Sequence, residues 1–345
     1  MINMSDGELM GNARQPEQHP RFLLRPKLQT SAGGCPDHDQ REVALDRREL
    51  RGLGRLSHDT RVAILFLLPF LVPYVVLKLW PIVYGFWISL HNWSSIGGNP
   101  TFVGAQNYQR IMHDQLFWKA FGNTVLFTAL ATPTLIALGM GLALVLNRSL
   151  PGGGMFRTLF YVPNMLSVSV ISLIFVAVLT ADSSGLVNNV LGNFGVGPIP
   201  FLLNQHTAMP SLASAAVWWT VGFNMLILLA GLQNIPGVII DDARVDGASG
   251  WRQFVSITLP LLRRPLMLVT ILQVIACFQV FGLVDVMTRG GPGGATRSLV
   301  YYLFERAFTN SQLGYGSAIA SILFLILFVV SISQLRFFRR QDDAA

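Results

Sequence analysis

The sequence predicts an all-α integral membrane protein with six transmembrane helices. Of the 345 residues, 52% are hydrophobic and only 12% are charged, and the mean hydropathy is +0.49. Soluble domains carry about 25% charged residues. Long stretches without any charge also recur along the chain, and about 20 apolar residues are enough for a helix to cross a bilayer. This composition excludes a disordered chain and argues against a soluble enzyme.

Residues 1–61 differ in composition from the rest of the chain. They contain ten of the 25 Lys and Arg residues and nine of the 18 Asp and Glu residues. They hold no apolar stretch long enough for the core of a signal peptide, so we expect no cleaved leader here. We interpret residues 1–61 as a polar, disordered cytoplasmic tail and residues 62–345 as the transmembrane domain.

The uncharged stretches locate the spans in this second region. Residues 120–147, 158–181, 265–284 and 307–335 contain no Asp, Glu, Lys or Arg, and neither does the longer stretch 183–240. Backbone groups in lipid must be paired within the segment, which makes the spans helical. The runs are too long and alternate too little for a porin-type barrel. The expected helices are 63–90, 121–146, 158–180, 211–232, 265–286 and 315–335.

The distribution of positive charge predicts the orientation. With the tail inside, 19 of the 25 Lys and Arg residues fall on the cytoplasmic side and five on the outer side. Cytoplasmic loops are enriched in Lys and Arg. We therefore expect the N-terminus and the C-terminus to be cytoplasmic. Binding to anionic headgroups accounts for the net charge of +7 without any nucleic acid.

Residues 233–264, between the fourth and fifth spans, form the longest internal cytoplasmic loop. The residues up to Asp246 predict a short helix, which Gly247 can end in a left-handed conformation. Ser249 can cap a second helix, and Pro260 is expected to stop it. Trp251, Phe254 and Val255 would share one face of this second helix. The loop therefore predicts a helix-turn-helix at the membrane surface.

The stretch 241–260 resembles the EAA loop of ABC importer permeases. In that pattern Glu-Ala-Ala is followed after three residues by Gly, and later by Phe and Ile-Thr-Leu-Pro. Asp241-Asp242-Ala243 stands where the family has Glu-Ala-Ala, while Gly247 and Phe254 match directly. The resemblance covers roughly residues 60–340 and is greatest for permeases of the carbohydrate-uptake branch, of the maltose and glycerol-phosphate type. Further similar segments are Trp80-Pro81-Ile82, Asn107-Tyr108, Arg157–Pro163, Gly290-Gly291-Pro292 and Gly314–Ala318.

The resemblance implies a subunit of an ATP-driven, binding-protein-dependent importer of a sugar or sugar-like solute in the bacterial inner membrane. Its implied partners are a second permease in a heterodimer, two ATPase subunits and an extracytoplasmic solute-binding protein. ATP and Mg belong to the ATPase, and this chain is expected to bind no cofactor or metal and to catalyse no reaction. The residues expected to couple to the ATPase are Asp241, Asp242, Ala243, Asp246, Gly247, Ala248, Leu259 and Pro260.

The predicted fourth and fifth spans carry polar and aromatic side chains. Polar groups in hydrocarbon are costly unless they face other helices or water. Aromatic faces and hydrogen-bonding groups would suit a sugar path through the bundle. Hydrogen bonds that only hold the helices together are an equally open interpretation. The candidate path residues are Trp218, Trp219, Asn224, Gln273, Phe278 and Gln279.

Other functions find little support in the sequence. A secondary solute transporter, the main alternative, would be expected to show internal repeats or a carboxylate in mid-membrane, and we find no clear repeat and no such carboxylate. A membrane enzyme would need a convergent nucleophile and base, but no GxSxG occurs. A structural scaffold would not explain the loop at 233–264. No GxxxxGK[ST] phosphate loop is present, and we interpret the glycines of 290–294 as a flexible external turn.

Overall fold

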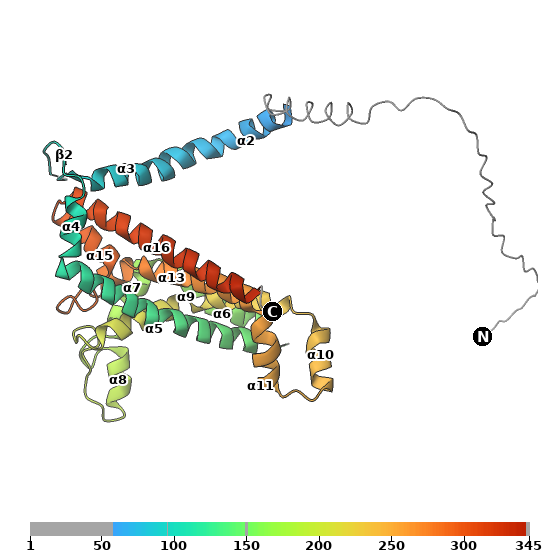
Figure 1. Cartoon of the computed structure of the whole chain (residues 1–345). Helices are drawn as coiled ribbons and strands as arrows, with labels where there is room; N and C mark the ends of the chain where they lie inside the picture. Colours follow the sequence, from blue (N-terminus) through green and yellow to red (C-terminus); the bar gives the residue numbers. More distant parts are fainter. Residues whose placement is uncertain (1–57, 95, 149–150, 343–345) are drawn as a thin grey trace, which may run out of the picture. The chain divides into compact units, whose positions relative to one another are not determined.

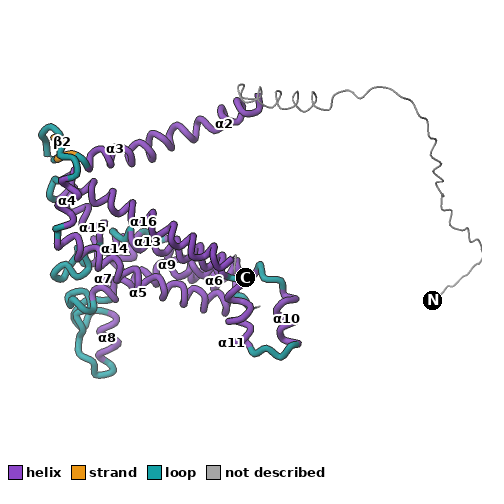
Figure 2. Tube along the Cα trace, in the orientation of Figure 1, coloured by secondary structure: helices purple, strands orange, loops and turns teal. Residues whose placement is uncertain are grey.

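The computed structural model describes residues 58–342 except 95, 149 and 150. Most of the predicted tail, 1–61, therefore lies outside the described residues. The chain divides into two units, residues 1–70 and 71–345. The described part of the first unit is the beginning of helix α2 (His58–Tyr74). The second unit is almost entirely helical (Figures 1 and 2).

The elements of the second unit follow one another with short connections. The helices are α3 (Trp80–Ser89), α4 (Gln106–Met112), α5 (Gln115–Leu146), α6 (Gly153–Met165), α7 (Val168–Val178), α8 (Leu186–Gly192), α9 (Ala208–Gln233), α10 (Gly237–Val245), α11 (Gly250–Gln253), α12 (Leu259–Leu261), α13 (Arg263–Phe278), α14 (Gly282–Met287), α15 (Leu299–Phe304) and α16 (Leu313–Asp342). Three π-helical turns join neighbouring helices: η1 (Val75–Leu79), η2 (Phe254–Thr258) and η3 (Glu305–Thr309). The strands β1 (His91–Asn92) and β2 (Thr101–Phe102) pair antiparallel.

The predicted helical membrane architecture is confirmed in part. Four helical segments of the described chain are long and apolar enough to cross a membrane, or up to six if each of two bent pairs counts as one span. The four are Leu65–Ser89, Gln115–Leu146, Ala208–Gln233 and Leu313–Phe338. They correspond to the first, second, fourth and sixth predicted spans. The two bent pairs correspond to the third and fifth.

The prediction of one continuous helix over 158–180 is wrong. Helices α6 and α7 meet at an angle of 98°. Leu166 and Ser167 between them adopt extended backbone conformations, and the Ser167 hydroxyl accepts a hydrogen bond from the Val170 N–H at 3.4 Å. A serine that caps a new helix in this way ends the preceding one. The carbonyl of Leu166 freed by this break is bonded by the indole N–H of Trp219 at 3.2 Å.

The prediction of one continuous helix over 265–286 is also wrong. The segment α11–α12 bends by 69° into α13, and α13 ends at Phe278. Residues 279–281 leave the helical path before α14 begins. After this break, α14 packs closely against α7: a Cβ on Gly282 would lie only 2.8 Å from the Val168 side chain.

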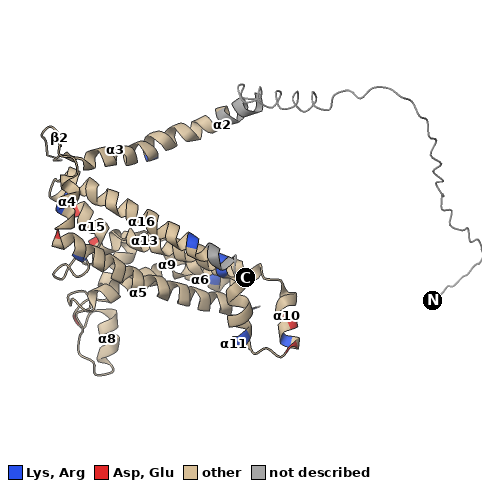
Figure 3. Ribbon diagram, viewed as in Figure 1, with Lys and Arg blue, Asp and Glu red and all other residues tan. Residues whose placement is uncertain are grey.

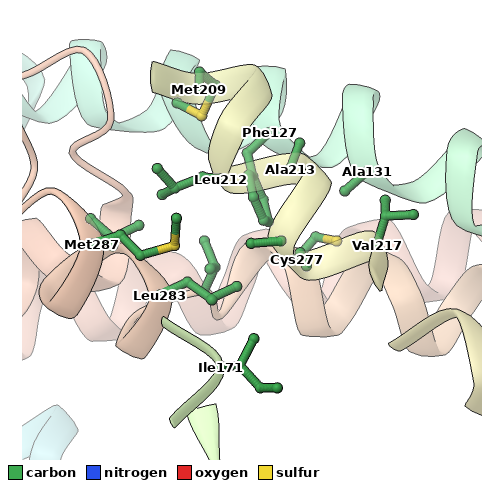
Figure 4. Close-up of a cluster of buried hydrophobic side chains, with 14 of the residues drawn as sticks. Phe127, Ala131, Ile171, Met209, Leu212, Ala213, Val217, Cys277, Leu283 and Met287 are labelled. Atoms are coloured by element: carbon green, nitrogen blue, oxygen red, sulfur yellow. The ribbon is translucent and has the colours of Figure 1, made fainter. Parts of the chain in front are cut away.

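The long helices α5, α9, α13 and α16 run lengthwise through the second unit (Figure 1). Buried apolar side chains join α5, α7, α9, α13 and α14, as Figure 4 shows for Phe127, Leu212 and Leu283. Two further apolar clusters lie toward the two ends of the bundle, one around Tyr302 and Ile319 and one around Leu228 and Leu262. The charged residues gather at the same two ends, and the long helices between them carry few (Figure 3). This distribution suits helices that cross a membrane.

Candidate functional site

A cavity of about 360 Å³ lies among α5, α7, α9, α13 and α14. We call it the central cavity. Most of its wall is apolar, but Trp219 and Thr220 from α9 and Gln273 and Gln279 from α13 and its end supply polar groups. A mostly apolar wall with a few polar groups is typical of small-molecule sites. The remaining lining residues are Phe127, Leu135, Val168, Ala216, Ala276, Cys277, Val280, Phe281, Gly282 and Leu283.

Three of the six predicted path residues therefore share one cavity: Trp219, Gln273 and Gln279. Trp218 does not line it. Its side chain, 45% exposed, borders a separate groove between α5 and α9. Phe278 is buried in the apolar cluster with Tyr302 and does not line the central cavity either.

Asn224 is fully buried and joins α9 to α13. Its side-chain oxygen accepts a hydrogen bond of 2.8 Å from the amide of Gln273, which is 5% exposed. Asn224 does not line the central cavity, whereas Gln273 does. The sequence left open whether these residues bond neighbouring helices or line a solute path. Asn224 makes an interhelical hydrogen bond and does not line the cavity, whereas Gln273 makes the same bond and also lines the cavity.

The breaks in the helices border the central cavity, and sequence reasoning did not predict them. Val168, directly after the first break, and Val280 and Phe281, within the second, all line it. The carbonyl of Val280 accepts a hydrogen bond of 2.7 Å from the hydroxyl of Ser298, which also caps α15. Irregular backbone at membrane depth is tolerated where it is buried in protein or lines a cavity.

The helix-turn-helix predicted in 233–264 is present as α10 and α11, at the end of the bundle where α16 ends (Figure 1). Gly247 has a φ of 74°, and its N–H bonds the Arg244 carbonyl while the Ala248 N–H bonds the Ala243 carbonyl, both at 3.0 Å. This pair of bonds is the Schellman motif that ends a helix. The Ser249 hydroxyl caps α11 as predicted, by accepting a hydrogen bond from the Arg252 N–H.

The prediction that Pro260 stops the second helix is wrong. The helix continues through the π-helical turn η2 and through α12 to Leu261. Pro260 lies inside this continuous helical segment, directly after η2 and one residue before the segment ends at Leu261. The chain then bends at Leu262 into α13.

Four of the eight predicted coupling residues lie on the exposed surface of α10 and of the turn that follows it. Asp241, Asp242, Asp246 and Gly247 are exposed, and Ala243 is buried. Asp241 is paired with Arg244 at 2.9 Å. Trp251 and Val255 are 75% and 42% exposed, whereas Phe254 packs against the apolar cluster around Leu228 and Leu262, so this chain covers only part of the apolar face predicted for the second helix.

A groove of about 850 Å³ opens between these two helices and the ends of α5 and α9. Asp241, Arg244 and Trp251 line it, with Arg148 beside the end of α5. The turn at Gly247 projects from the same pair of helices (Figure 1).

Within the part of the chain that the structure describes, no group of three His, Cys, Asp or Glu side chains could hold a metal ion. The two main features are thus a cavity between helices and an exposed helical turn at one end of the bundle.

A family model described as binding-protein-dependent transport system inner membrane component matches residues 135–343.

Relatives match over most of their length. The chain is 35% identical over 285 residues to the trehalose/maltose transport system permease protein MalF of Thermococcus litoralis, covering 83% of this chain and 96% of that protein. It is 33% identical over 277 residues to the probable ABC transporter permease protein YurN of Bacillus subtilis, covering 78% and 94%. The chain belongs to the ABC importer permease family. It is a multi-pass inner-membrane protein and a non-catalytic subunit, and members of this family bind no cofactor themselves.

A solved structure supports the fold of the permease. The bacterial alginate ABC transporter in complex with alginate pentasaccharide-bound periplasmic protein has a similar chain, with a TM-score of 0.73 and 19% identity. The match covers 82% of this permease and 95% of that chain.

The permease also contains a charged cluster that sequence reasoning missed, at the end opposite α10. The carboxylate of Asp114 accepts hydrogen bonds from the hydroxyls of Tyr302 and Tyr315, the latter at 2.5 Å. The Arg306 guanidinium donates to the Tyr302 hydroxyl at 2.8 Å. Burial acts to raise the pKa of Asp114, but these hydroxyls and two backbone N–H groups outweigh it and hold that pKa below its usual value.

The segment 290–294, predicted to be a flexible turn, is tied to α5 near this cluster. Lys119 donates to the Gly293 carbonyl and Asn123 to the Gly294 carbonyl, both at 2.8 Å. Thr288 and Thr296 close the loop with a hydroxyl–hydroxyl contact of 2.8 Å. The prediction of a flexible turn is therefore not supported.

Proposed function

We propose that this permease imports a sugar or sugar-like solute through the central cavity. The observation that carries the proposal is the meeting of Trp219, Thr220, Gln273 and Gln279 around one cavity between helices. An indole face can stack on the apolar face of a sugar ring, and amides and a hydroxyl can bond its hydroxyl groups. The names of relatives point the same way, with trehalose/maltose for the Thermococcus protein and arabinooligosaccharides for a Bacillus subtilis permease.

The two adjacent tryptophans provide a matched test. We expect Trp219→Ala to reduce uptake of the transported sugar strongly, because it removes an aromatic wall of the cavity. Trp218→Ala removes an indole of the same size outside the cavity and should leave uptake near the parent level. The assay is uptake of radiolabelled maltose, trehalose or arabino-oligosaccharides by the assembled transporter. Equal effects of the two substitutions would contradict the role of the cavity.

We further propose six spans, with each bent pair counted as one, and cytoplasmic N- and C-termini. This orientation puts α10 and α11 in the cytoplasm, and it is supported by the excess of Lys and Arg on that side. Labelling of single cysteines near Gly247 with a membrane-impermeant reagent tests it. Labelling in inverted vesicles but not in intact cells is expected.

The proposed partners follow from this orientation. Two ATPase subunits would bind at α10 and α11, a second permease would complete the pathway as a heterodimer, and a solute-binding protein would dock at the opposite end. The exposed Trp251 and the groove beside Arg244 and Asp241 give the ATPase an uncovered surface. Closure of the ATPase dimer would then move α10 and α11 as a rigid body and switch the access of the central cavity.

The turn between α10 and α11 allows this coupling to be tested. Gly247→Val forces a β-branched residue into left-handed geometry, which costs about 1–2 kcal/mol for a residue with a Cβ. No atom lies within 4 Å of the added Cβ, so only the turn is disturbed. We expect membrane insertion to persist and ATPase binding to be lost.

Gly154→Ala is the control, because Gly154 also has open space, its φ is not positive and it does not line the groove. Co-purification of the ATPase with each variant is the readout. Normal uptake and normal ATPase recovery with Gly247→Val would refute the coupling role.

A further inference from the structure

The short helix α8 carries an apolar stripe that this chain does not cover. Leu186 is 64% exposed, Val190 is 50% exposed, and Phe194, just beyond the helix end, is 80% exposed. The spacing of four places Leu186 and Val190 on one helical face, one turn apart, and Phe194 continues that row. The stripe is unexplained by the central cavity or by α10 and α11.

The opposite face of α8 is fixed to the protein. Asn188 is 2% exposed, and its amide donates to the carbonyls of Thr180 and Ile199 at 2.8 and 3.0 Å. Its side-chain oxygen accepts the Ile199 N–H at 2.9 Å. Val187 beside it packs on the buried apolar cluster of the bundle. These contacts hold α8 in one orientation, so the outward direction of the stripe is built into the fold.

A polar row flanks the stripe on its other side. Asn189 and Asn193 are exposed and lie four residues apart. At about 100° per residue, Asn189 lies about 60° from Leu186 and about 100° from Val190, on the side of the stripe away from Val187, whereas Asn193, at the helix end, lies only about 20° from Leu186. Residues 183–207, which include α8, contain no charged side chain.

The direction of α8 shows where such a surface would lie. Figure 1 shows α8 running across the direction of α5 and α16, at the end of the bundle opposite α10 and α11. Helix α8 lies in the connection between the end of α7 at Val178 and the start of α9 at Ala208, so a helix that runs across the spans there lies along the membrane surface. Amphipathic helices in this position bury their apolar face about 5–10 Å into the boundary between headgroups and acyl chains.

We propose that α8 is an interfacial membrane helix whose stripe of Leu186, Val190 and Phe194 inserts among lipids at that boundary. A protein partner fits less well. Three side chains fall far short of the about 800 Å² that each side of a standard protein interface buries, and residues 183–207 around them include no Asp, Glu, Lys or Arg. The proposal does not depend on the identity of the solute or on which leaflet is the outer one.

Spin labels test the proposal on the whole transporter. Single cysteines replace Leu186, Val190 or Phe194 in the stripe, and Asn189 in the polar row as the matched control on the same helix. All four positions are exposed, so folding should persist, and Cys35→Ser removes the cysteine of the tail. The buried Cys277 stays, and the unsubstituted parent gives its background. The complex is reconstituted in phosphatidylcholine–phosphatidylglycerol nanodiscs.

Collisions with oxygen, which concentrates in lipid, are compared with collisions with a water-soluble nickel chelate. We expect oxygen to dominate at the stripe, at a depth of about 5–10 Å, and nickel to dominate at the polar row. Nickel access that is equal in both rows would place the stripe in water and overturn the proposal. An immobile label that neither reagent reaches at the stripe would show a covering protein and would also overturn it. ATPase activity of the same samples reports separately on transporter assembly.

Discussion

The hydrogen bond between Asn224 and Gln273 provides a quantitative test of which polar residues hold the bundle together. The two side chains are 0% and 5% exposed and are joined at 2.8 Å. Removing one partner leaves the other buried and unpaired, which costs about 1–3 kcal/mol. Measured interhelical hydrogen bonds in membranes average about 0.6 kcal/mol and reach about 1.7 kcal/mol.

The environments of the two residues predict unequal single effects. After Asn224→Ala, the amide of Gln273 can turn toward the central cavity and find water, so a cost near 1 kcal/mol is expected. After Gln273→Ala, Asn224 has no cavity to face and its oxygen stays dry, so the cost should lie nearer 3 kcal/mol. The double variant should cost less than the sum of the two singles, by about 0.6–1.7 kcal/mol.

The assay is unfolding of the purified permease by titration with sodium dodecyl sulfate, followed by circular dichroism. Thr134→Ala serves as the control, because its exposed hydroxyl bonds only the Leu130 carbonyl of its own helix. Additive single effects, within about 0.3–0.5 kcal/mol, would refute the reasoning. Sugar uptake adds a second readout. Gln273→Ala should raise the sugar concentration needed for half-maximal uptake more than Asn224→Ala does, because Gln273 lines the central cavity and Asn224 does not.

Three further predictions concern the helix contacts and the charged cluster around Asp114. Gly222→Ala should destabilise the permease by about 1–3 kcal/mol or more, seen as a lower unfolding temperature, because the added Cβ would lie 2.0 Å from the Phe160 carbonyl oxygen. Ser298→Ala should cost about 1–3 kcal/mol in the same assay by leaving the Val280 carbonyl unpaired. The pKa of Asp114 is lower in the folded permease than in the unfolded chain. Its ionised carboxylate therefore adds fully to the free energy of unfolding above about pH 4, and this contribution is lost as pH falls through the folded-state pKa. The unfolding temperature of the parent should therefore drop in strong acid more than that of Asp114→Asn, and parallel curves would contradict this.

The spans were predictable because charge is the feature that lipid excludes most strongly. The uncharged stretches located three of the four long helices, whereas Lys78 interrupts the first of the four, Leu65–Ser89. The limits of Ala208–Gln233 lie within three residues of the prediction. The helix breaks were not predictable in this way. A break within an uncharged stretch leaves the charge pattern unchanged. It depends on whether a freed carbonyl finds a donor, and the donors Trp219 and Ser298 are 53 and 18 residues away from the carbonyls that they bond.

The turn between α10 and α11 was predictable because its determinants are local. A glycine with positive φ and a capping serine act within a few residues, and both form as expected at Gly247 and Ser249. The path residues depend instead on which face of a helix points inward. Trp218 and Trp219 are adjacent in sequence, yet only Trp219 reaches the central cavity. Residue type selected both tryptophans, and tertiary packing separated them.

The broken helices and the central cavity form one arrangement. Both breaks border the cavity, and each frees a carbonyl that a side chain then bonds. The donor at the first break is Trp219, whose ring also forms part of the cavity wall. A solute that displaced this ring would therefore act directly on the joint between α6 and α7. Ser298 links the second break to α15, where Tyr302 joins Asp114 and α5. The irregular backbone at the second break is thus linked, through Ser298 and the short helix α15, to the Asp114 cluster at the end of the bundle opposite α10.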